Sequence, residues 1–251
     1  MGKLPVGLQL YTVREAMGND VPGTLKAVAD AGYEGVEFAG YYDYSAEDLK
    51  AMLDDLGLVC CGAHTPLTGI LPEGVQETID FALALGNKYI VGPGLPSEYT
   101  ESVEAWQRTA GIFSQTAATL GQAGLKLGYH NHKHEFIQKF EGVTGWQTFF
   151  DAASDAVFSQ LDVGHVLRAD EDPVEALNRY PGRFATVHVK DIDESKTDVF
   201  TGDGIADWET IFDICESTGG TEWYIVEHED YPIPPIECAA RCLVNIRAMG
   251  R

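Results

Sequence analysis

Histidines and carboxylates stand at the ends of several hydrophobic runs in this chain of 251 residues. Four segments share the pattern: residues 129–132, 161–165, 187–191 and 226–229. Six of the seven histidines lie in or directly beside these segments, and the seventh, His64, ends a further apolar run. Imidazole and carboxylate groups together are typical ligands of transition-metal ions. The pattern therefore predicts one polar site built by several strands, and a metal ion is its most economical explanation.

Short apolar runs alternate with amphipathic stretches along the whole chain, and we expect these to be strands and helices. The expected strands are residues 6–11, 35–38, 59–63, 89–92, 126–130, 158–162, 184–189 and 223–227. The expected helices are residues 21–31, 45–56, 75–85, 103–123, 144–153, 173–178, 208–217 and 236–249. Eight strand–helix units in about 250 residues predict an α/β fold, a single (β/α)8 TIM barrel over residues 1–251. The alternative is a doubly wound sheet, which usually has a glycine-rich loop after its first strand, and residues 12–15 contain no glycine.

In such a barrel, the C-terminal ends of all strands meet at one mouth. Asp162, His188 and Glu227 end three consecutive expected strands, so two carboxylates and an imidazole should converge there. This mixture suits Mn²⁺, Co²⁺, Zn²⁺ or Fe²⁺ better than Ca²⁺, which prefers oxygen ligands alone. Each residue also has a structural alternative: Asp162 as a helix cap, His188 as a core histidine, and Glu227 as a partner of Lys190. We favour metal binding because all three residues stand at strand ends.

The composition excludes several classes of function. A net charge of −22 argues against a nucleic-acid partner, since phosphate binding needs clustered lysine and arginine. No apolar run approaches the ~20 residues that span a membrane, and residues 1–5 show no signal peptide. We therefore expect a cytoplasmic protein without a membrane partner. The five cysteines form no CxxC motif, which argues against a structural zinc site and a disulfide framework.

The sequence resembles the xylose-isomerase-like TIM-barrel superfamily, often described as sugar phosphate isomerases/epimerases. The resemblance covers essentially the whole chain. The segments that carry it are residues 7–11, 35–38, 129–136, 161–165, 188–191, 202–208 and 227–228. It implies a divalent metal, commonly Mn²⁺ with Mg²⁺ among the alternatives, held at the ends of strands five to eight. It also implies a small sugar or polyol substrate, and barrels of this family often form homo-oligomers.

The chain departs from this family's ketose epimerases at the end of strand five. Those epimerases carry a glutamate there, as metal ligand and acid–base group, whereas this chain has His130, with His132 and Glu135 downstream. Members resembling inosose dehydratase also have histidines here. We predict a metal-dependent sugar isomerase or epimerase that abstracts a proton α to a carbonyl. A dehydratase or other lyase is the close alternative, and endonuclease IV-like DNA repair or non-catalytic sugar binding are weaker ones.

The predicted site residues fall into three groups. Asp162, His188, Glu227 and His130 are the expected metal ligands, with His132 or Glu135 as alternatives for the fourth. Glu227, His130 and Glu135 are the expected catalytic groups. His64, Glu37, His132, His165 and Lys190 are the expected substrate-binding residues. For Lys190, a solvated surface charge is the alternative interpretation, and for Glu37 the alternative is a contact that holds a neighbouring histidine.

Overall fold

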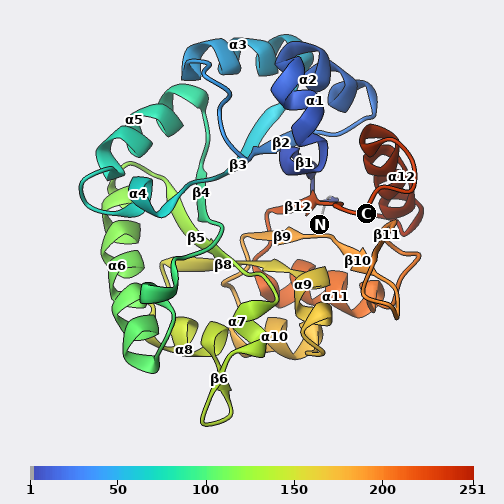
Figure 1. The fold of residues 1–251 in the computed structure, drawn as a ribbon. Coiled ribbons are helices and arrows are strands. Elements are labelled where there is room, and N and C mark those ends of the chain that lie inside the picture. The colour runs from blue at the N-terminus through green and yellow to red at the C-terminus, as the bar shows by residue number, and fades with distance from the viewer. Residues whose placement is uncertain (1–2) are drawn as a thin grey trace.

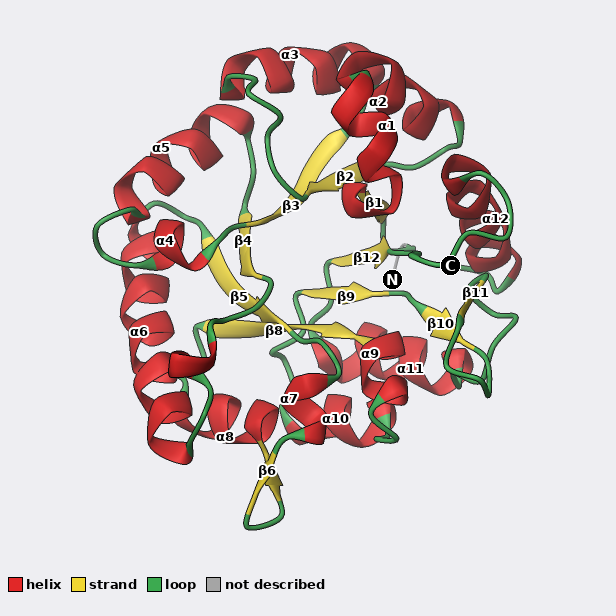
Figure 2. Ribbon diagram, in the orientation of Figure 1, coloured by secondary structure: helices red, strands yellow, loops and turns green. Residues whose placement is uncertain are grey.

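Eight parallel strands close into a barrel that is surrounded by helices (Figures 1 and 2). The computed structural model describes residues 3–251. The strands are β1 Val6–Gln9, β2 Gly35–Phe38, β3 Val59–His64, β4 Tyr89–Gly92, β5 Lys126–His130, β8 Val157–Asp162, β9 Thr186–His188 and β12 Trp223–Val226. Around the barrel their order is β1-β12-β9-β8-β5-β4-β3-β2. This confirms the predicted (β/α)8 architecture; that residues 1–251 form a single domain stays a prediction, and residues 1–2 lie outside the described part.

The outer layer consists of helices that begin and end close to the predicted positions. These helices are α2 Val21–Asp30, α3 Ala46–Leu56, α5 Val75–Leu85, α6 Val103–Gln122, α8 Gly145–Ala152, α10 Pro173–Arg179, α11 Trp208–Ile214 and α12 Pro235–Ala248. Ser45 and Asp207 cap the starts of α3 and α11 with their side-chain oxygens, since each accepts a backbone N–H of the first turn. Gly57 ends α3 at a φ of 68°, in the left-handed region that glycine adopts without strain.

Further short elements lie mainly in the loops after the strands. The sequence did not predict them, except that the helix expected over residues 208–217 reaches into the last one. They are the 3₁₀ turns Leu10–Val13 and Ser97–Tyr99, the short helices α1 Arg14–Asn19, α4 Leu67–Ile70, α7 His134–Ile137 and α9 Val163–Arg168, the hairpins β6 Lys139–Phe140 with β7 Val143–Thr144 and β10 Asp191–Ile192 with β11 Asp198–Val199, and a π turn Cys215–Gly219 that follows α11. The first strand ends at Gln9, two residues earlier than predicted. The Gln9 side chain accepts the backbone N–H of Tyr11 at 2.9 Å, and this contact starts the turn.

The register of the strands places polar residues opposite one another on neighbouring strands. Asp162 on β8 pairs with His188 on β9, His130 on β5 with Gln160 on β8, and Gln9 on β1 with Glu37 on β2. A large apolar core packs between the strands and helices, with Trp106, Phe149 and Phe212 among its buried members. Among residues 3–251, no helix is long and apolar enough to cross a membrane. The barrel thus carries its polar groups at the C-terminal ends of the strands.

Candidate functional site

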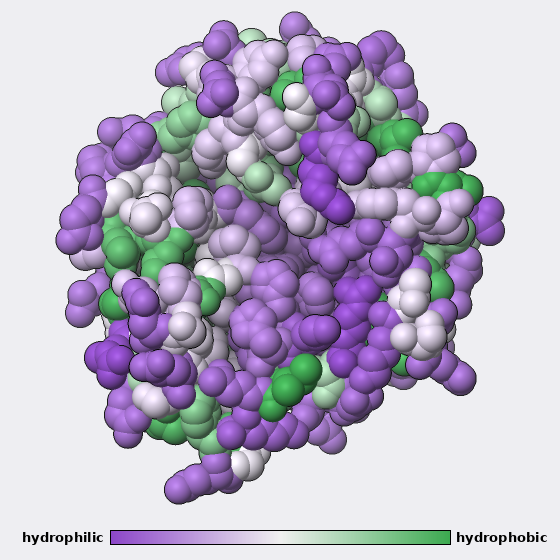
Figure 3. Space-filling view, in the orientation of Figure 1, coloured by the Kyte–Doolittle hydropathy of each residue, from purple (hydrophilic) through white to green (hydrophobic). Residues whose placement is uncertain are grey.

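A polar cavity of about 740 Å³ opens at the barrel mouth. Its lining includes Tyr11, Arg14, His64, His130, His132, His165 and Glu227. The surface around the central hollow is hydrophilic (Figure 3). A cavity with a few convergent polar groups is where a small-molecule site is expected. Three of the predicted substrate-binding residues, His64, His132 and His165, line it.

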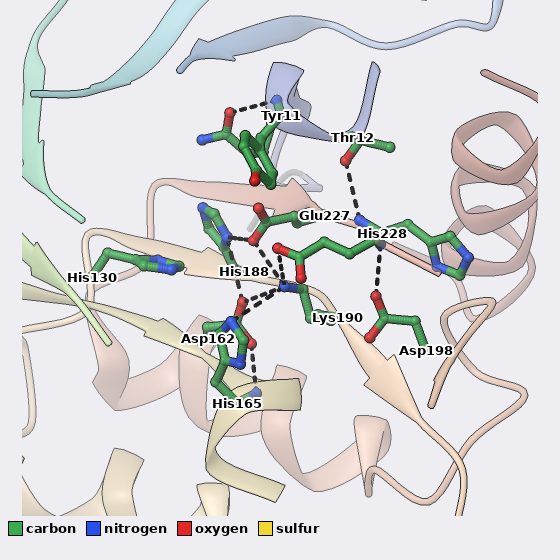
Figure 4. Close-up of polar contacts among 12 residues, drawn as sticks. Tyr11, Thr12, His130, Asp162, His165, His188, Lys190, Asp198, Glu227 and His228 are labelled. Carbon is green, nitrogen blue, oxygen red and sulfur yellow. Dashed lines mark hydrogen bonds and ion pairs between the residues drawn. The ribbon is translucent and has the colours of Figure 1, made fainter. Parts of the chain in front are cut away.

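The predicted metal ligands lie together at the floor of this mouth. His130, Asp162, His188 and Glu227 each offer one ligand atom, and these atoms lie within 4.8 Å of one another. They come from β5, β8, β9 and the residue after β12, and their side chains converge (Figure 4). All four residues are buried. The structure thus brings together the residues that the sequence predicted would meet.

The imidazole of His188 is held from both sides. Its Nε2 lies 2.7 Å from Glu37 Oε2, and its Nδ1 lies 3.0 Å from Glu227 Oε2 and 3.7 Å from Asp162 Oδ2. Burial opposes protonation, but Glu37 and the other carboxylates outweigh it and raise the pKa of His188 well above its usual value. A carboxylate behind an imidazole is the usual way in which a metal-binding histidine is oriented. Nδ1 is therefore the nitrogen that His188 presents to the site.

The two carboxylate oxygens of Asp162 have different surroundings. Its Oδ1 accepts the backbone N–H of His165 at 2.8 Å and so caps α9. Its Oδ2 is buried and has no hydrogen-bond partner among the described residues. Such an oxygen is costly to bury unless a cation meets it, and the Lys190 ammonium, 3.4 Å away, does so in part. The helix-cap interpretation of Asp162 is correct, and it leaves Oδ2 free for a metal ion. Two carboxylates and one or two imidazoles fit a divalent transition-metal ion.

Lys190 is fully buried directly beside these carboxylates. Its Nζ lies 3.1 Å from Glu227 Oε2, 3.4 Å from Asp162 Oδ2 and 3.4 Å from Glu229 Oε1. Burial would lower its pKa, but the three carboxylates raise it above the usual value. The interpretation of Lys190 as a solvated surface charge is wrong. Its ammonium group neutralises the acidic floor of the site, and the predicted Glu227–Lys190 pair is present.

Gln160, on β8, sets the hydrogen-bonding roles of two histidines. Its Nε2 donates to Glu37 Oε1 at 2.7 Å and to Thr186 Oγ1 at 2.8 Å. Its Oε1 therefore accepts from His64 Nε2 at 2.9 Å and from His130 Nδ1 at 3.1 Å. His130 is thus left with a lone pair on Nε2. Burial, with His188 and His64 nearby, lowers the pKa of His130 well below its usual value, so that it is neutral.

Glu37 lies at the base of this network, beneath the cavity. Besides His188 and Gln160, it accepts a hydrogen bond from Gln9 Nε2 at 2.7 Å. Burial would raise its pKa, but His64 and His188 lower it well below the usual range. Gly62 makes room for this side chain, because a Cβ at residue 62 would lie 2.5 Å from Glu37 Oε1. The sequence left Glu37 to hold either a substrate hydroxyl or a neighbouring histidine, and its carboxylate contacts His188.

The sequence interpretation did not single out Gln160 or Gln9. The signal was the alternation along the strands: residue 160 lies on the same face of β8 as Asp162, and a glutamine inside an apolar strand needs a polar partner.

The remaining predicted residues surround His132. Its ring centroid lies 5.0 Å from that of His130 and 5.0 Å from that of His165. Burial lowers the pKa of His165 to about 3. Glu135 is fully buried and does not line the cavity: it accepts hydrogen bonds from the Tyr129 hydroxyl at 2.6 Å and the His132 N–H at 2.8 Å. These contacts favour a positioning role for Glu135, and its catalytic role stays a prediction.

Comparison with known proteins identifies the family. A family model described as a xylose isomerase-like TIM barrel matches residues 25–245. The chain belongs to the xylose isomerase-like TIM barrel family. This confirms the resemblance deduced from the strand-end motifs.

Three similar proteins illustrate two of the names that occur among the relatives of this chain. An inosose dehydratase from Glaesserella parasuis is 28% identical and covers 90% of this chain and 89% of its own length. An inosose dehydratase from Clostridium perfringens is 27% identical, and the match covers 89% of this chain and 88% of the relative's own length. The crystal structure of a sugar phosphate isomerase/epimerase from Parabacteroides distasonis is 28% identical, with a TM-score of 0.82, and covers 99% of this chain and 95% of its own. These three similar proteins are thus named as dehydratases or as an isomerase/epimerase.

Proposed function

We propose that this protein is a metal-dependent enzyme that removes the proton α to the carbonyl of a small polyhydroxylated ketone and then eliminates water. The observation that carries the proposal is His130, a neutral imidazole at the end of β5 with a free Nε2 lone pair. The names of the inosose dehydratases support the same reaction class. The sequence placed isomerisation first and dehydration second, and the geometry around His130 favours the reverse order.

The proposed metal ligands are Asp162, His188 and Glu227, and Mn²⁺ suits this mixture of oxygen and nitrogen. When bound, the cation supplies Lewis-acid polarisation of the substrate carbonyl and neutralises charge that develops on its oxygen. Glu37 fixes the His188 ring, and Lys190 offsets the charge of the carboxylates. Three protein ligands leave positions open for substrate oxygens.

In the proposed reaction, His130 Nε2 takes the proton from the carbon next to the carbonyl. The electron pair of that C–H bond becomes the new C=C bond, and the C–O bond of the hydroxyl on the next carbon breaks. The proton now on Nε2 passes to the departing hydroxyl, which leaves as water. No oxidant is needed, and His130 returns to its neutral form. An imidazole of this kind can serve first as base and then as acid.

Symmetrical epimerisation needs a second carboxylate facing the opposite side of the substrate. A carboxylate that lines the cavity and was predicted to be catalytic, Glu227, lies 3.0 Å from His188 Nδ1 and 3.1 Å from Lys190 Nζ. Burial would raise the pKa of Glu227, but Lys190 and His188 lower it well below its usual value, so this carboxylate is a weak base toward a substrate proton. This arrangement is the reason to place elimination before epimerisation.

The test is to incubate the Mn²⁺-loaded protein with a panel of inososes and keto-sugars in D₂O. We expect loss of water. The absorbance of the unsaturated product and mass spectrometry would measure it. Deuterium incorporation with the carbon skeleton and all hydroxyls retained would contradict dehydration.

Epimerisation is the second candidate. Its support is the close structural match to the Parabacteroides distasonis sugar phosphate isomerase/epimerase, at a TM-score of 0.82 and 28% identity. The same experiment separates the two, since an epimerase would return a stereoisomer of the substrate with deuterium at the α carbon.

A further inference from the structure

The geometry points to a second cation site, separate from the first, at the rim of the barrel mouth. We propose that His132, His134 and Glu135, on the segment that follows β5, bind a Zn²⁺-like transition-metal ion. Each offers one ligand atom, and these atoms lie within 4.8 Å of one another. The site shares no residue with the Asp162–His188–Glu227 group, and it does not depend on the proposed function.

Glu135 supplies a fixed anionic ligand. It is fully buried, and its Oε1 accepts a hydrogen bond from the Tyr129 hydroxyl at 2.6 Å, while Oε2 accepts the backbone N–H of His132 at 2.8 Å. The same Oε1 lies 3.0 Å from His134 Nε2. Buried carboxylates are costly unless a positive charge meets them. In this structure the half-exposed His134 lies beside the carboxylate of Glu135. At a pH at which the His134 imidazole is neutral, a metal ion would supply the positive charge instead.

His132 supplies a nitrogen without a partner. Its Nδ1 is buried and makes no hydrogen bond to any residue in the range 3–251. Its ring stacks on that of His134, with centroids 5.6 Å apart and planes inclined by 16°. Two imidazoles and a carboxylate are a frequent protein ligand set for zinc, with a fourth position for water. Tetrahedral ligands of zinc are roughly 3.4 Å apart, so the half-exposed His134 side chain has to rotate out of the stacked arrangement for both imidazoles to reach one ion.

A cation at this rim would also affect the cavity. His132 lines the cavity, and its ring lies 5.0 Å from those of His130 and His165. Zinc would fix the orientation of that ring. The rim site therefore connects an ion from solution to a side chain that faces the substrate.

The test is to count zinc ions on the full chain, by calorimetric titration and by metal analysis after dialysis. We expect two ions per chain for the wild type and one for His134→Ala. His134→Lys keeps a positive charge beside Glu135 and cannot bind zinc in this way, so it should also bind one ion. Lys133→Ala, an exposed neighbour, serves as the matched control and should bind two.

Asp162→Asn separates this inference from the first site, because it should lose the ion at the barrel floor and keep the one at the rim. If the barrel-floor site alone did not bind zinc, the wild type would bind one ion, and His134→Ala would bind none. Equal zinc content in the wild type, His134→Ala and His134→Lys would mean that His134 and Glu135 form an ion pair only, and would overturn the inference. Thermal unfolding of each variant checks that it is folded.

Discussion

The Nε2 atom of His188 lies 2.7 Å from Glu37 Oε2, a contact that crosses the barrel interior from β9 to β2. Both side chains are fully buried. The contact fixes which imidazole nitrogen faces Asp162 and Glu227, and it increases the electron density on that nitrogen. Glu37 was predicted from sequence to hold a substrate hydroxyl or a neighbouring histidine, and its position beneath His188 suits a residue that would support the proposed metal site from behind.

Glu37→Gln should therefore weaken metal binding without removing a ligand. Glutamine can still accept the hydrogen bond from His188, but it brings no negative charge. Loss of such a supporting carboxylate typically costs about 10–100-fold in metal affinity. Calorimetric titration with Mn²⁺ would measure it. Glu34→Gln, on the surface near the start of the same strand, is the matched control and should bind like the wild type. Equal affinity in both variants would contradict the role assigned to Glu37.

Asp162→Asn should separate metal binding from stability. Asparagine is as good a helix cap as aspartate, so the contact to the N–H of His165 can persist. The ligand charge is lost, however, and we expect the bound metal to fall sharply and activity to disappear. Metal analysis and urea unfolding would measure the two effects on the same samples. Asp172→Asn, which changes the cap of α10, is the control. Full metal content in Asp162→Asn would remove the basis for the proposed site.

His165 should make the protein sensitive to acid. Burial lowers its pKa to about 3, from an ordinary value of 6.5. Below pH 6.5 the unfolded chain therefore binds a proton that the folded chain does not, and stability falls until the pH reaches about 3. At pH 4.5 this loss amounts to about 2–3 kcal/mol, since each pKa unit is worth about 1.4 kcal/mol.

Replacing His165 by Asn removes the titrating group, so the free energy of unfolding should fall less between pH 7 and pH 4.5. Urea unfolding in the presence of EDTA, at both pH values, would measure the difference. His134→Asn is a useful control, because the contact with Glu135 raises the pKa of His134. An identical acid response in the wild type and His165→Asn would contradict the proposed cause.

Most of the fold was predictable because its signals are local. Apolar runs of four to six residues, helix caps such as Ser45 and glycines such as Gly57 depend on neighbours along the chain. The short elements after the strands were missed for the opposite reason. The turn at Leu10–Val13 depends on a side-chain contact of Gln9, and α9 begins where a predicted ligand, Asp162, also acts as a cap.

The sequence predicted which residues meet at the site, but it did not predict which charged groups contact one another there. A strand end predicts that a residue reaches the mouth, so Asp162, His188 and Glu227 could be grouped. Whether Lys190 faces solvent or three carboxylates depends on how β9 leads into β10, which no local pattern shows. The roles of His64 and His130 depend on the orientation of a single amide, that of Gln160, and this follows only from its contact with Glu37.

His130→Glu should keep the metal and change the reaction. A carboxylate at the end of β5 adds an oxygen ligand, so affinity for Mn²⁺ should be equal or higher. As a metal ligand this carboxylate would be held away from the leaving hydroxyl and could not pass the proton to it, so we expect dehydration to fall by about 10²–10⁴-fold. Exchange of the α proton in D₂O should persist, because a carboxylate can still act as the base. His130→Gln, which offers no base, should lose both exchange and dehydration while staying folded. Undiminished dehydration in His130→Glu would show that the acid and base lie elsewhere, and unfolding of both variants would assign His130 a structural role.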